Sequence, residues 1–277
     1  MTSRCITGIF SSWLIFIISI IAGCGPHSEP NFVCEEPCLR IITYNINWGV
    51  ANPQNVIDYI VGSNADIICL QETHRYWEAI LSTNLKNLYQ YCVFKEWPGA
   101  GGMAIMSRYE LHNVTLIKPV DGWFPAILTN VEAPLGRLQC LNVHLKPPLS
   151  DRGSVNVSAY YQAPDIHLKE LQGFMEKTEA DMPLVIAGDF NENESGKAIQ
   201  WLFEQGFNDA LSTYDTYSKT WAWKTSFGIK LKNRYDHILF SKDMNCIGAL
   251  VQEVEASDHM PVLAVIVSDK SEKSSMP

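Results

Sequence analysis

The sequence predicts an α/β protein in which two β-sheets pack together and are covered by helices, in one domain. Its 277 residues are 47% hydrophobic and 18% charged, a globular composition with enough length for one large domain. Residues 38–85 read as strand, helix, strand, helix, whereas most signals in residues 89–145 are strands. Strands and helices are therefore interleaved along the chain, as packed sheets with helical covers require.

Each element rests on its own pattern of apolar and turn residues. Strands are predicted at residues 38–46, 65–72, 89–94, 102–107, 126–134, 137–145, 182–190, 235–241, 247–255 and 259–267. Helices are predicted at residues 52–64, 75–85, 167–177 and 196–205. In the first helix Asn52 is the expected N-cap and Pro53 the first helical residue.

The N-terminal segment has the pattern of a targeting signal. Arg4 precedes an apolar stretch over residues 5–20, and small residues then lead to Cys24. This pattern resembles a bacterial lipoprotein signal, which implies cleavage before Cys24, a lipid on that cysteine, and export to the cell envelope. The expected divisions are a signal peptide at 1–24, a linker at 25–37, the domain at 38–268 and a flexible tail at 269–277. An uncleaved membrane anchor is the alternative, because the apolar stretch is close to the length of a membrane span.

Six of the eight cysteines lie beyond this signal. An even number in an exported chain permits disulfides, and Cys34 with Cys38 is the first pair to test. Cys69 and Cys140 lie within expected core strands, so buried free thiols are predicted there. The net charge of -9 argues against a histone-like grip on nucleic acid, although a local basic stripe remains compatible with it.

Polar residues gather where the apolar strands end. They are Asn45, Asn47, Glu72, His144, Asp189, Asn191, Asp258 and His259. Any one of them alone is more often a turn residue or a helix cap. Because sites in α/β sheets form at strand ends, we expect this set to converge in space.

The stretch "LVIAGDFNENESGK" distinguishes between two kinds of phosphate chemistry. Its Gly-Lys lacks the spacing and the hydroxyl of a nucleotide-binding loop. A carboxylate site fits better, because Asp189 and Asn191 would face the same way in an extended segment. Glu72 and Asp258 can supply oxygen ligands to Mg²⁺ or Mn²⁺. The sequence therefore favours metal-dependent phosphoester hydrolysis, with histidines as donors and Asp236 orienting one imidazole.

The motifs "TYNIN", "LQET", "GGMAIMSR", "NVHL", "GDFN", "RYDHILFS" and "SDHMPV" occur in an order that resembles the endonuclease/exonuclease/phosphatase family. The resemblance implies a four-layered α/β sandwich like that of deoxyribonuclease I, with two mainly antiparallel sheets between helices. It also implies that Glu72, Asn45 and Asp258 serve the metal and that Asp189 positions or deprotonates water. The implied roles of the remaining site residues are phosphate binding by Asn191, a coupled acid and imidazole in Asp236 and His259, and a second histidine in His144.

Three functional hypotheses follow, and no obligate protein partner is inferred. The leading one is a lipid-anchored, Mg²⁺- or Mn²⁺-dependent phosphodiesterase or nuclease for nucleic acid outside the cytoplasm. The second changes the substrate to a phospholipid or phosphoinositide headgroup, although no long exposed apolar hairpin is evident. The third is a noncatalytic binding lipoprotein. Residues 219–234 combine cations with aromatic side chains, either to cradle an anionic substrate or as a solvated hairpin with two core tryptophans.

Overall fold

The computed structural model describes residues 32, 34, 37–49, 53–150, 152–154, 156–225 and 227–269. The segment Phe32–Pro277 is one compact unit. The predicted signal, its Cys24, and the Asn52 cap lie outside the described residues. Across the ranges given above, no helix is both long and apolar enough to cross a membrane.

Two six-stranded sheets form the middle of this unit. The first contains β1 (Cys38–Asn45), β2 (Ile67–Gln71), β3 (Tyr91–Lys95), β4 (Met103–Ser107), β13 (Met244–Val251) and β14 (Val262–Ser268), in the order β13-β14-β1-β2-β4-β3. The second contains β5 (Leu111–Ile117), β6 (Ala126–Ala133), β7 (Gly136–His144), β8 (Leu184–Asp189), β9 (Asn208–Asp209) and β12 (Asp236–Phe240), in the order β5-β6-β7-β8-β12-β9. Only β1 with β2 and β7 with β8 pair in parallel among these described strands, so the prediction of two mainly antiparallel sheets is confirmed.

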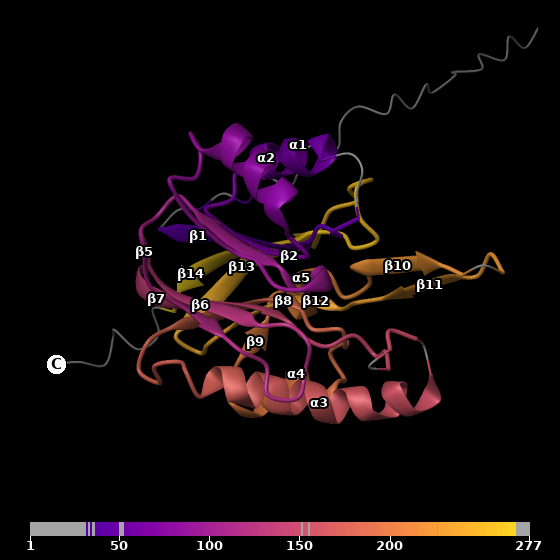
Figure 1. Ribbon diagram of the computed structural model, residues 1–277. Helices are drawn as coiled ribbons and strands as arrows, with labels where there is room; N and C mark the ends of the chain where they lie inside the picture. The colour runs from indigo at the N-terminus through magenta and orange to yellow at the C-terminus, as the bar shows by residue number, and fades with distance from the viewer. Residues whose placement is uncertain are drawn as a thin grey trace, which may run out of the picture. The chain divides into compact units, whose positions relative to one another are not determined.

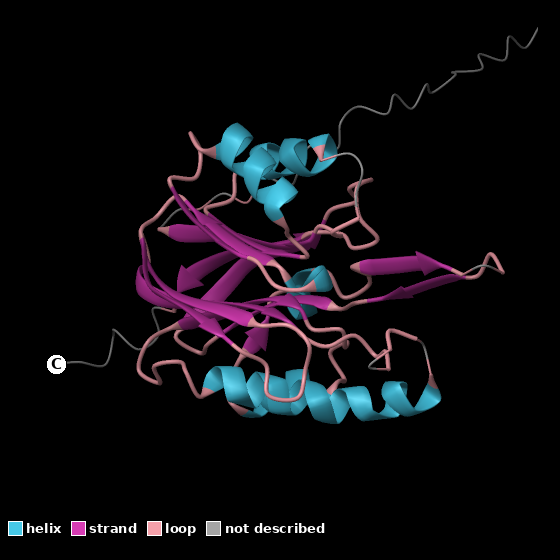
Figure 2. Cartoon of the chain, in the orientation of Figure 1, coloured by secondary structure: helices cyan, strands magenta, loops and turns pink. Residues whose placement is uncertain are grey.

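Helices cover the outer face of each sheet, which completes the predicted four layers (Figures 1 and 2). The helices α1 (Gln54–Ser63) and α2 (Arg75–Leu85) lie over the first sheet, and α3 (Val157–Met175) and α4 (Lys197–Glu204) lie over the second. The short helices η1 (Gly99–Gly101) and α5 (Leu211–Tyr214) lie in connections between strands.

Strand alternation explains how wholly apolar strands fit between these layers. In β2, Ile67 and Cys69 face the core between the sheets, whereas Ile68 and Leu70 pack beneath α1 and α2. Successive side chains point to opposite faces of a strand, so a strand covered on both sides must be apolar throughout. The short apolar runs in the sequence are therefore the central strands of the sandwich.

Helix α3 begins ten residues before its predicted start at residue 167. Its first two turns are mostly exposed and carry no apolar stripe, and Pro164 inside the helix normally signals a break. The helix starts here because the Asn156 side chain caps it, accepting a hydrogen bond of 2.7 Å from the backbone of Ala159. The strands β5 and β9 and the helix α5 were also not predicted from the sequence.

A two-stranded hairpin projects from the sandwich at residues 219–234 (Figure 1). It consists of β10 (Trp221–Lys224) and β11 (Lys230–Asn233), paired so that Trp223 lies opposite Leu231. The same alternation puts Trp221 and Trp223 on one face and three lysines on the other. Trp223 is 46% exposed, so the alternative of two core tryptophans is wrong. Phe227 in the turn region is 91% exposed, so this short hairpin also presents an apolar side chain.

The predictions for the cysteines are confirmed. Cys34 and Cys38 form a disulfide with a Cα–Cα distance of 6.2 Å. Cys69 and Cys140 are buried free thiols whose sulfur atoms lie 3.5 Å apart between the two sheets.

Gly188 of β8 is required by the close approach of β7. A Cβ atom at this position would lie 2.0 Å from the carbonyl oxygen of Val143. We therefore expect Gly188→Ala to lower the free energy of unfolding by about 2 kcal/mol or more, as measured by urea denaturation. The control is Gly62→Ala in α1, where a Cβ meets nothing within 4 Å and the change should be neutral or stabilising by up to about 1 kcal/mol. Equal effects of the two substitutions would contradict this account.

Candidate active site

The pairing register of three neighbouring strands brings the predicted site residues together. His144 at the end of β7 pairs with Asp189 at the end of β8, and Asp189 pairs with Asp236 at the start of β12. Their side chains have the same parity as the core residues of these strands, so all three point into the space between the sheets. Asn45 at the end of β1 has the matching parity on the opposite sheet. The site therefore forms where the intersheet space opens at one edge.

A buried polar layer joins the two sheets directly beneath this edge. Gln71 donates a hydrogen bond of 2.7 Å to the side-chain oxygen of Asn142, and Asn142 donates to the carbonyls of Leu70 and Ala104 at 3.0 and 2.9 Å. Buried amides that are fully bonded fix the relative position of the groups they join. Hydrogen bonds between strands of the two sheets thus hold the two halves of the site in place.

Asp189 is the centre of the cluster. One of its oxygens, Oδ1, accepts the backbone N–H of Asn191 at 2.9 Å, and Oδ2 accepts the Asn45 amide at 3.0 Å. The Nε2 atoms of His144 and His259 each lie 3.6 Å from the same Oδ2. Burial raises the pKa of the Asp189 carboxyl, while the two histidines oppose that shift. A carboxylate with a raised pKa in this position is suited to accept a proton from water.

His259 and Asp236 form a tight buried pair. The Nδ1 atom of His259 lies 2.8 Å from Oδ2 of Asp236. Burial by itself would lower the pKa of His259, but the charges of Asp236 and Asp189 outweigh it and raise that pKa to about 10. The imidazole is therefore a cation at neutral pH, with Nε2 directed toward Asp189.

His144 has the opposite protonation state. Burial lowers its pKa to about 4, so the ring is neutral at neutral pH. Its ring is stacked on Phe124 with centroids 4.2 Å apart, and Nδ1 is buried with no partner among the described residues. No acidic partner could be assigned to His144 from the sequence, and in the structure the carboxylate beside it is Asp189, which it shares with His259.

Glu72 and Asp258 lie on the first-sheet side of the cluster, and both accept hydrogen bonds from neighbouring residues. Glu72 accepts the Asn45 amide at 3.0 Å and the backbone N–H of Trp48 at 3.1 Å. Asp258 accepts the side chains of Asn47 at 3.0 Å and Trp221 at 3.2 Å. Burial raises the pKa of Glu72, and the nearby Asp258 charge adds to that increase.

The backbone is strained at the same place. The φ angle of Glu72 is +61°, a left-handed conformation that is unfavourable for a glutamate. Of the five described non-glycine residues with positive φ, the others in the cluster are Asn47 and Asn191. Strain of this kind is commonly concentrated at functional sites, where the surrounding structure enforces it.

The donor set fits a divalent cation. Four carboxylates, those of Glu72, Asp189, Asp236 and Asp258, surround one imidazolium, which leaves an excess of buried or half-buried negative charge. Oxygen ligands of this type suit Mg²⁺ or Mn²⁺. Donor atoms of Asp189, Asp236 and His259 also lie within 4.8 Å of one another, close enough to share an ion. Glu72 and Asp258 offer a second set of oxygen ligands on the first-sheet side of the cluster.

Two predicted side chains take orientations that differ from the expected ones. Asn191 does not continue β8 in extended form, since its φ is +51° and its amide donates to the carbonyl of Leu145 at 2.9 Å. The prediction that Asn191 and Asp189 face the same way in an extended segment is therefore wrong, and Asn191 contacts Asp189 through its backbone instead. Asn45 presents its nitrogen, not its oxygen, to Glu72 and Asp189, so it acts as a donor between them.

Two residues outside the predicted set, Ser257 and Trp221, support the site. Ser257 donates to the Asn45 carbonyl at 2.8 Å and accepts the backbone N–H of His259 at 3.1 Å. Trp221 bonds to Asp258, and its position forms an isolated bridge with that of His259. Ser257 begins the motif "SDHMPV", and Trp221 belongs to the aromatic and basic segment 219–234, but neither was predicted to contact the site residues.

His167 on α3 belongs to a separate buried network. Its Nδ1 lies 3.1 Å from a Glu192 oxygen and its Nε2 lies 2.6 Å from the carbonyl of Lys146. Since Glu192 also accepts the backbone N–H of Ile199, this network ties α3 to the start of α4. His167 thus has a structural role in joining α3 to α4.

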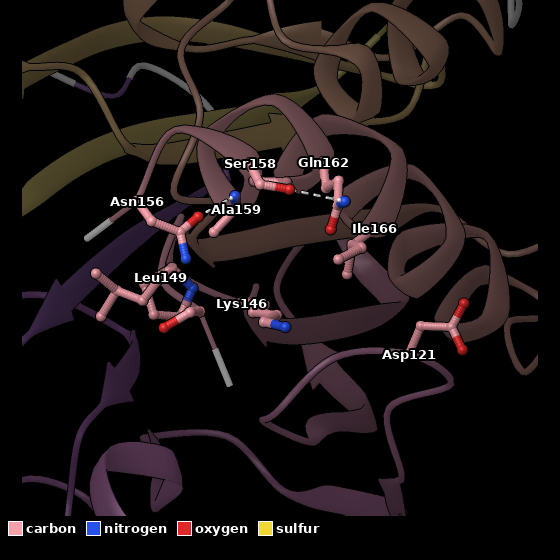
Figure 3. Close-up of a pocket in the computed structure, with 11 residues that line it drawn as sticks. Asp121, Lys146, Leu149, Asn156, Ser158, Ala159, Gln162 and Ile166 are labelled. Carbon is pink, nitrogen blue, oxygen red and sulfur yellow. Dashed lines mark hydrogen bonds between the residues drawn. The ribbon is translucent and has the colours of Figure 1, made fainter. Parts of the chain in front are cut away.

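A cavity of about 420 Å³ lies beside the first half of α3 (Figure 3). Lys146 and Asp121 line it opposite the α3 side chains of Ser158 and Gln162. Asp121 is already paired with Lys169 at 3.2 Å. The cavity contains none of the predicted site residues, so the chemistry belongs to the edge around Asp189.

The protonated His259 gives the folded protein a pH dependence of known sign. Because its folded pKa is raised from about 6.5 to about 10, its contribution to stability is complete below about pH 6.5 and is lost as the pH rises toward 10. With chelator present, the free energy of unfolding should therefore decline over this window, and it should decline less in His259→Gln. Urea denaturation at several pH values measures both slopes. Identical slopes would show that His259 is not charged in the folded protein.

Solved structures similar to this chain share its fold. An endonuclease/exonuclease/phosphatase from Beutenbergia cavernae DSM 12333 has a TM-score of 0.69 at 19% identity, covering 84% of this chain and 72% of that one. The human Nocturnin catalytic domain with bound sulfate has a TM-score of 0.66 at 20% identity, covering 86% and 96%. TDP2 of D. rerio, complexed with single-strand DNA product, has a TM-score of 0.66 at 15% identity, covering 83% and 99%. No curated protein matches the sequence.

A family model matches most of the chain as well. The match runs over residues 42–259, which includes every residue of the cluster described above. The predicted fold and the resemblance drawn from the motifs are thus confirmed. The chain belongs to the endonuclease/exonuclease/phosphatase family, whose members hydrolyse phosphoesters.

Proposed function

We propose that this protein is a divalent-metal-dependent phosphodiesterase that cuts nucleic acid outside the cytoplasm. The observation that carries the proposal is the arrangement around Asp189, a buried carboxylate with a cationic and a neutral histidine against one oxygen. This arrangement places a proton acceptor and a proton donor in the same cluster, and phosphodiester hydrolysis uses both. A protein that only binds its ligand does not need such a pair of proton-transfer groups.

The residues divide the reaction between them. Asp189 takes a proton from the water whose oxygen attacks phosphorus. His259, held by Asp236, gives a proton from Nε2 to the leaving oxygen as its bond to phosphorus breaks. His144 is neutral and stacked on Phe124, and its Nε2 points toward Asp189, where it can hold the substrate phosphate without adding charge. Glu72 and Asp258 would hold the metal, which when bound offsets the negative charge of the phosphate.

Two observations support nucleic acid as the substrate. The hairpin carries Lys224, Lys230 and Lys232 on one face, so it offers a basic surface in an otherwise acidic chain. The D. rerio TDP2 structure of similar fold was solved with a single-strand DNA product.

A phospholipid headgroup is the second candidate substrate. The hairpin residues Phe227 and Ile229 are 91% and 61% exposed, and apolar side chains beside lysines also suit an anionic membrane surface. This candidate keeps the same chemistry at Asp189 and changes only the group that carries the phosphate.

A hydrolysis panel tests the proposal. A chain lacking the first 31 residues should cleave DNA or RNA with Mg²⁺ or Mn²⁺, lose activity in chelator, and regain it when metal is restored. Activity on phospholipid vesicles with none on polynucleotides would establish the second candidate. Activity that persists in chelator would show that hydrolysis does not depend on a metal.

The variants Asp189→Asn and His259→Ala should each reduce kcat/KM at least about 100-fold, because general acid–base groups contribute about 10²–10⁴-fold. His112→Ala is the matched control, because His112 is partly exposed and pairs only with Glu110 at 3.7 Å. Its activity should be unchanged. Full activity in His259→Ala would exclude the proposed proton donor.

We also propose, from the sequence, that Cys24 carries a lipid in the bacterial envelope. Expression of the full chain in a bacterium should place it in the membrane fraction, and Cys24→Ala should block lipid attachment and processing. Mass spectrometry of the mature N-terminus measures the difference. A mature chain that begins elsewhere, or that bears no lipid, would contradict the anchor.

A further inference from the structure

A second cavity, of about 250 Å³, adjoins the active site on the side of α3. Its walls include Tyr160 and Tyr161 from the first turns of α3, Tyr235 from the residue before β12, and Pro148. Asn191 lines it too. We call this cavity the tyrosine pocket.

The tyrosine pocket connects directly to the reacting groups. The backbone N–H of Asn191 bonds to Asp189, and the carbonyl of Tyr235 accepts the N–H of Phe190 at 2.8 Å. Tyr235 lines the pocket and directly precedes Asp236, whose position pairs with that of Asp189. A substituent on the phosphate at Asp189 therefore lies next to this pocket.

The same aromatic wall continues to the other side of the site. The Tyr235 ring packs against Trp221 with centroids 5.2 Å apart. Trp221 in turn donates to Asp258 and begins the hairpin. The pocket and the hairpin are thus parts of one surface that runs past the reacting groups.

Packing does not account for the two tyrosines on α3. Tyr160 is 64% exposed and Tyr161 is 75% exposed, with ring centroids 5.8 Å apart. They lie in the part of α3 that carries no apolar stripe. Large rings kept exposed at the mouth of a pocket are available to stack on a planar ligand.

The rest of the lining specifies the kind of ligand. Asn193 and Asn233 add amide groups, which bond to the edges of polar rings. The carboxylate of Glu192 also lines the pocket, but its two oxygens are bonded to His167 and to the backbone of Ile199. Aromatic faces with amide donors and acceptors match a nucleobase better than an aliphatic chain.

We propose that the tyrosine pocket binds one unpaired nucleobase next to the phosphate that is cut, so that single-stranded nucleic acid is the preferred substrate. This inference rests on the proposed function. A cavity of about 250 Å³ has room for one ring system, and a base that enters it cannot stay paired in a duplex. The lysine face of the hairpin supplies charge for the neighbouring phosphates.

The test uses single-stranded oligonucleotides with one hydrolysable phosphodiester. In two further substrates the base on one or the other side of that bond is replaced by an abasic residue. The wild-type protein should cleave the intact substrate with a kcat/KM at least about fivefold higher than one of the abasic substrates, as base stacking on aromatic side chains predicts. It should also cleave single strands faster than the same sequence in a duplex.

Variants assign this preference to the pocket. Tyr160→Ala with Tyr161→Ala should abolish the difference between intact and abasic substrates, while Tyr160→Phe with Tyr161→Phe should retain it. Tyr217→Ala is the matched control, because Tyr217 is 91% exposed and does not line the pocket. Circular dichroism shows whether each variant is folded, and the exposure of both tyrosines predicts that it is.

The outcomes separate the inference from the proposed function. Metal-dependent cleavage of nucleic acid with no base preference, or with a preference that survives the double alanine substitution, would overturn the pocket and leave the phosphodiesterase intact. No cleavage of any oligonucleotide, with hydrolysis of phospholipid vesicles, would overturn both. Loss of the preference in the alanine variant alone supports the pocket.

Discussion

The active site depends on the hydrogen-bonding register of β7, β8 and β12. This register aligns His144, Asp189 and Asp236 in one row and points all three into the space between the sheets. A shift of β8 by one residue would turn Asp189 toward the helices α3 and α4, because side chains alternate along a strand. Gly188 protects the register, since only a residue without a side chain permits the observed approach of β7. The position of the reacting groups therefore depends on how the backbones of β7, β8 and β12 pair.

The second determinant is the unequal charge of two histidines around one acid. His144 and His259 are equally distant from Asp189, but only His259 has its own carboxylate in Asp236. Burial without such a partner neutralises an imidazole, and burial with one charges it. The contact between His259 and Asp236 thus makes His259 a cationic donor, while His144, which lacks such a contact, stays neutral. Glu72 and Asp258 lie on the other side of this cluster, and oxygen ligands of this type suit a divalent cation.

The sequence predicted the parts of this protein that depend on periodicity. Apolar runs covered on both faces gave the central strands, and polar residues at their ends gave the cluster around Asp189. It did not predict the direction of Asn191, because the left-handed turn after β8 is enforced by tertiary contacts with Leu145. The early start of α3 was missed because an exposed helix has no apolar stripe, and the role of Trp221 was missed because it reaches Asp258 only through the hairpin fold.

The cysteines of this chain include one joined pair and one buried pair of neighbouring thiols. Cys34 and Cys38 are joined, whereas Cys69 and Cys140 remain thiols although their sulfur atoms lie 3.5 Å apart. The hydrogen bond between them and their burial raise the pKa of the Cys69 thiol, so the reactive thiolate is scarce. Small oxidants would also have to enter a close-packed core to reach this pair. At this point the two sheets are therefore joined by packing and by the side-chain amide hydrogen bonds of Gln71 and Asn142, without a covalent cross-link between Cys69 and Cys140.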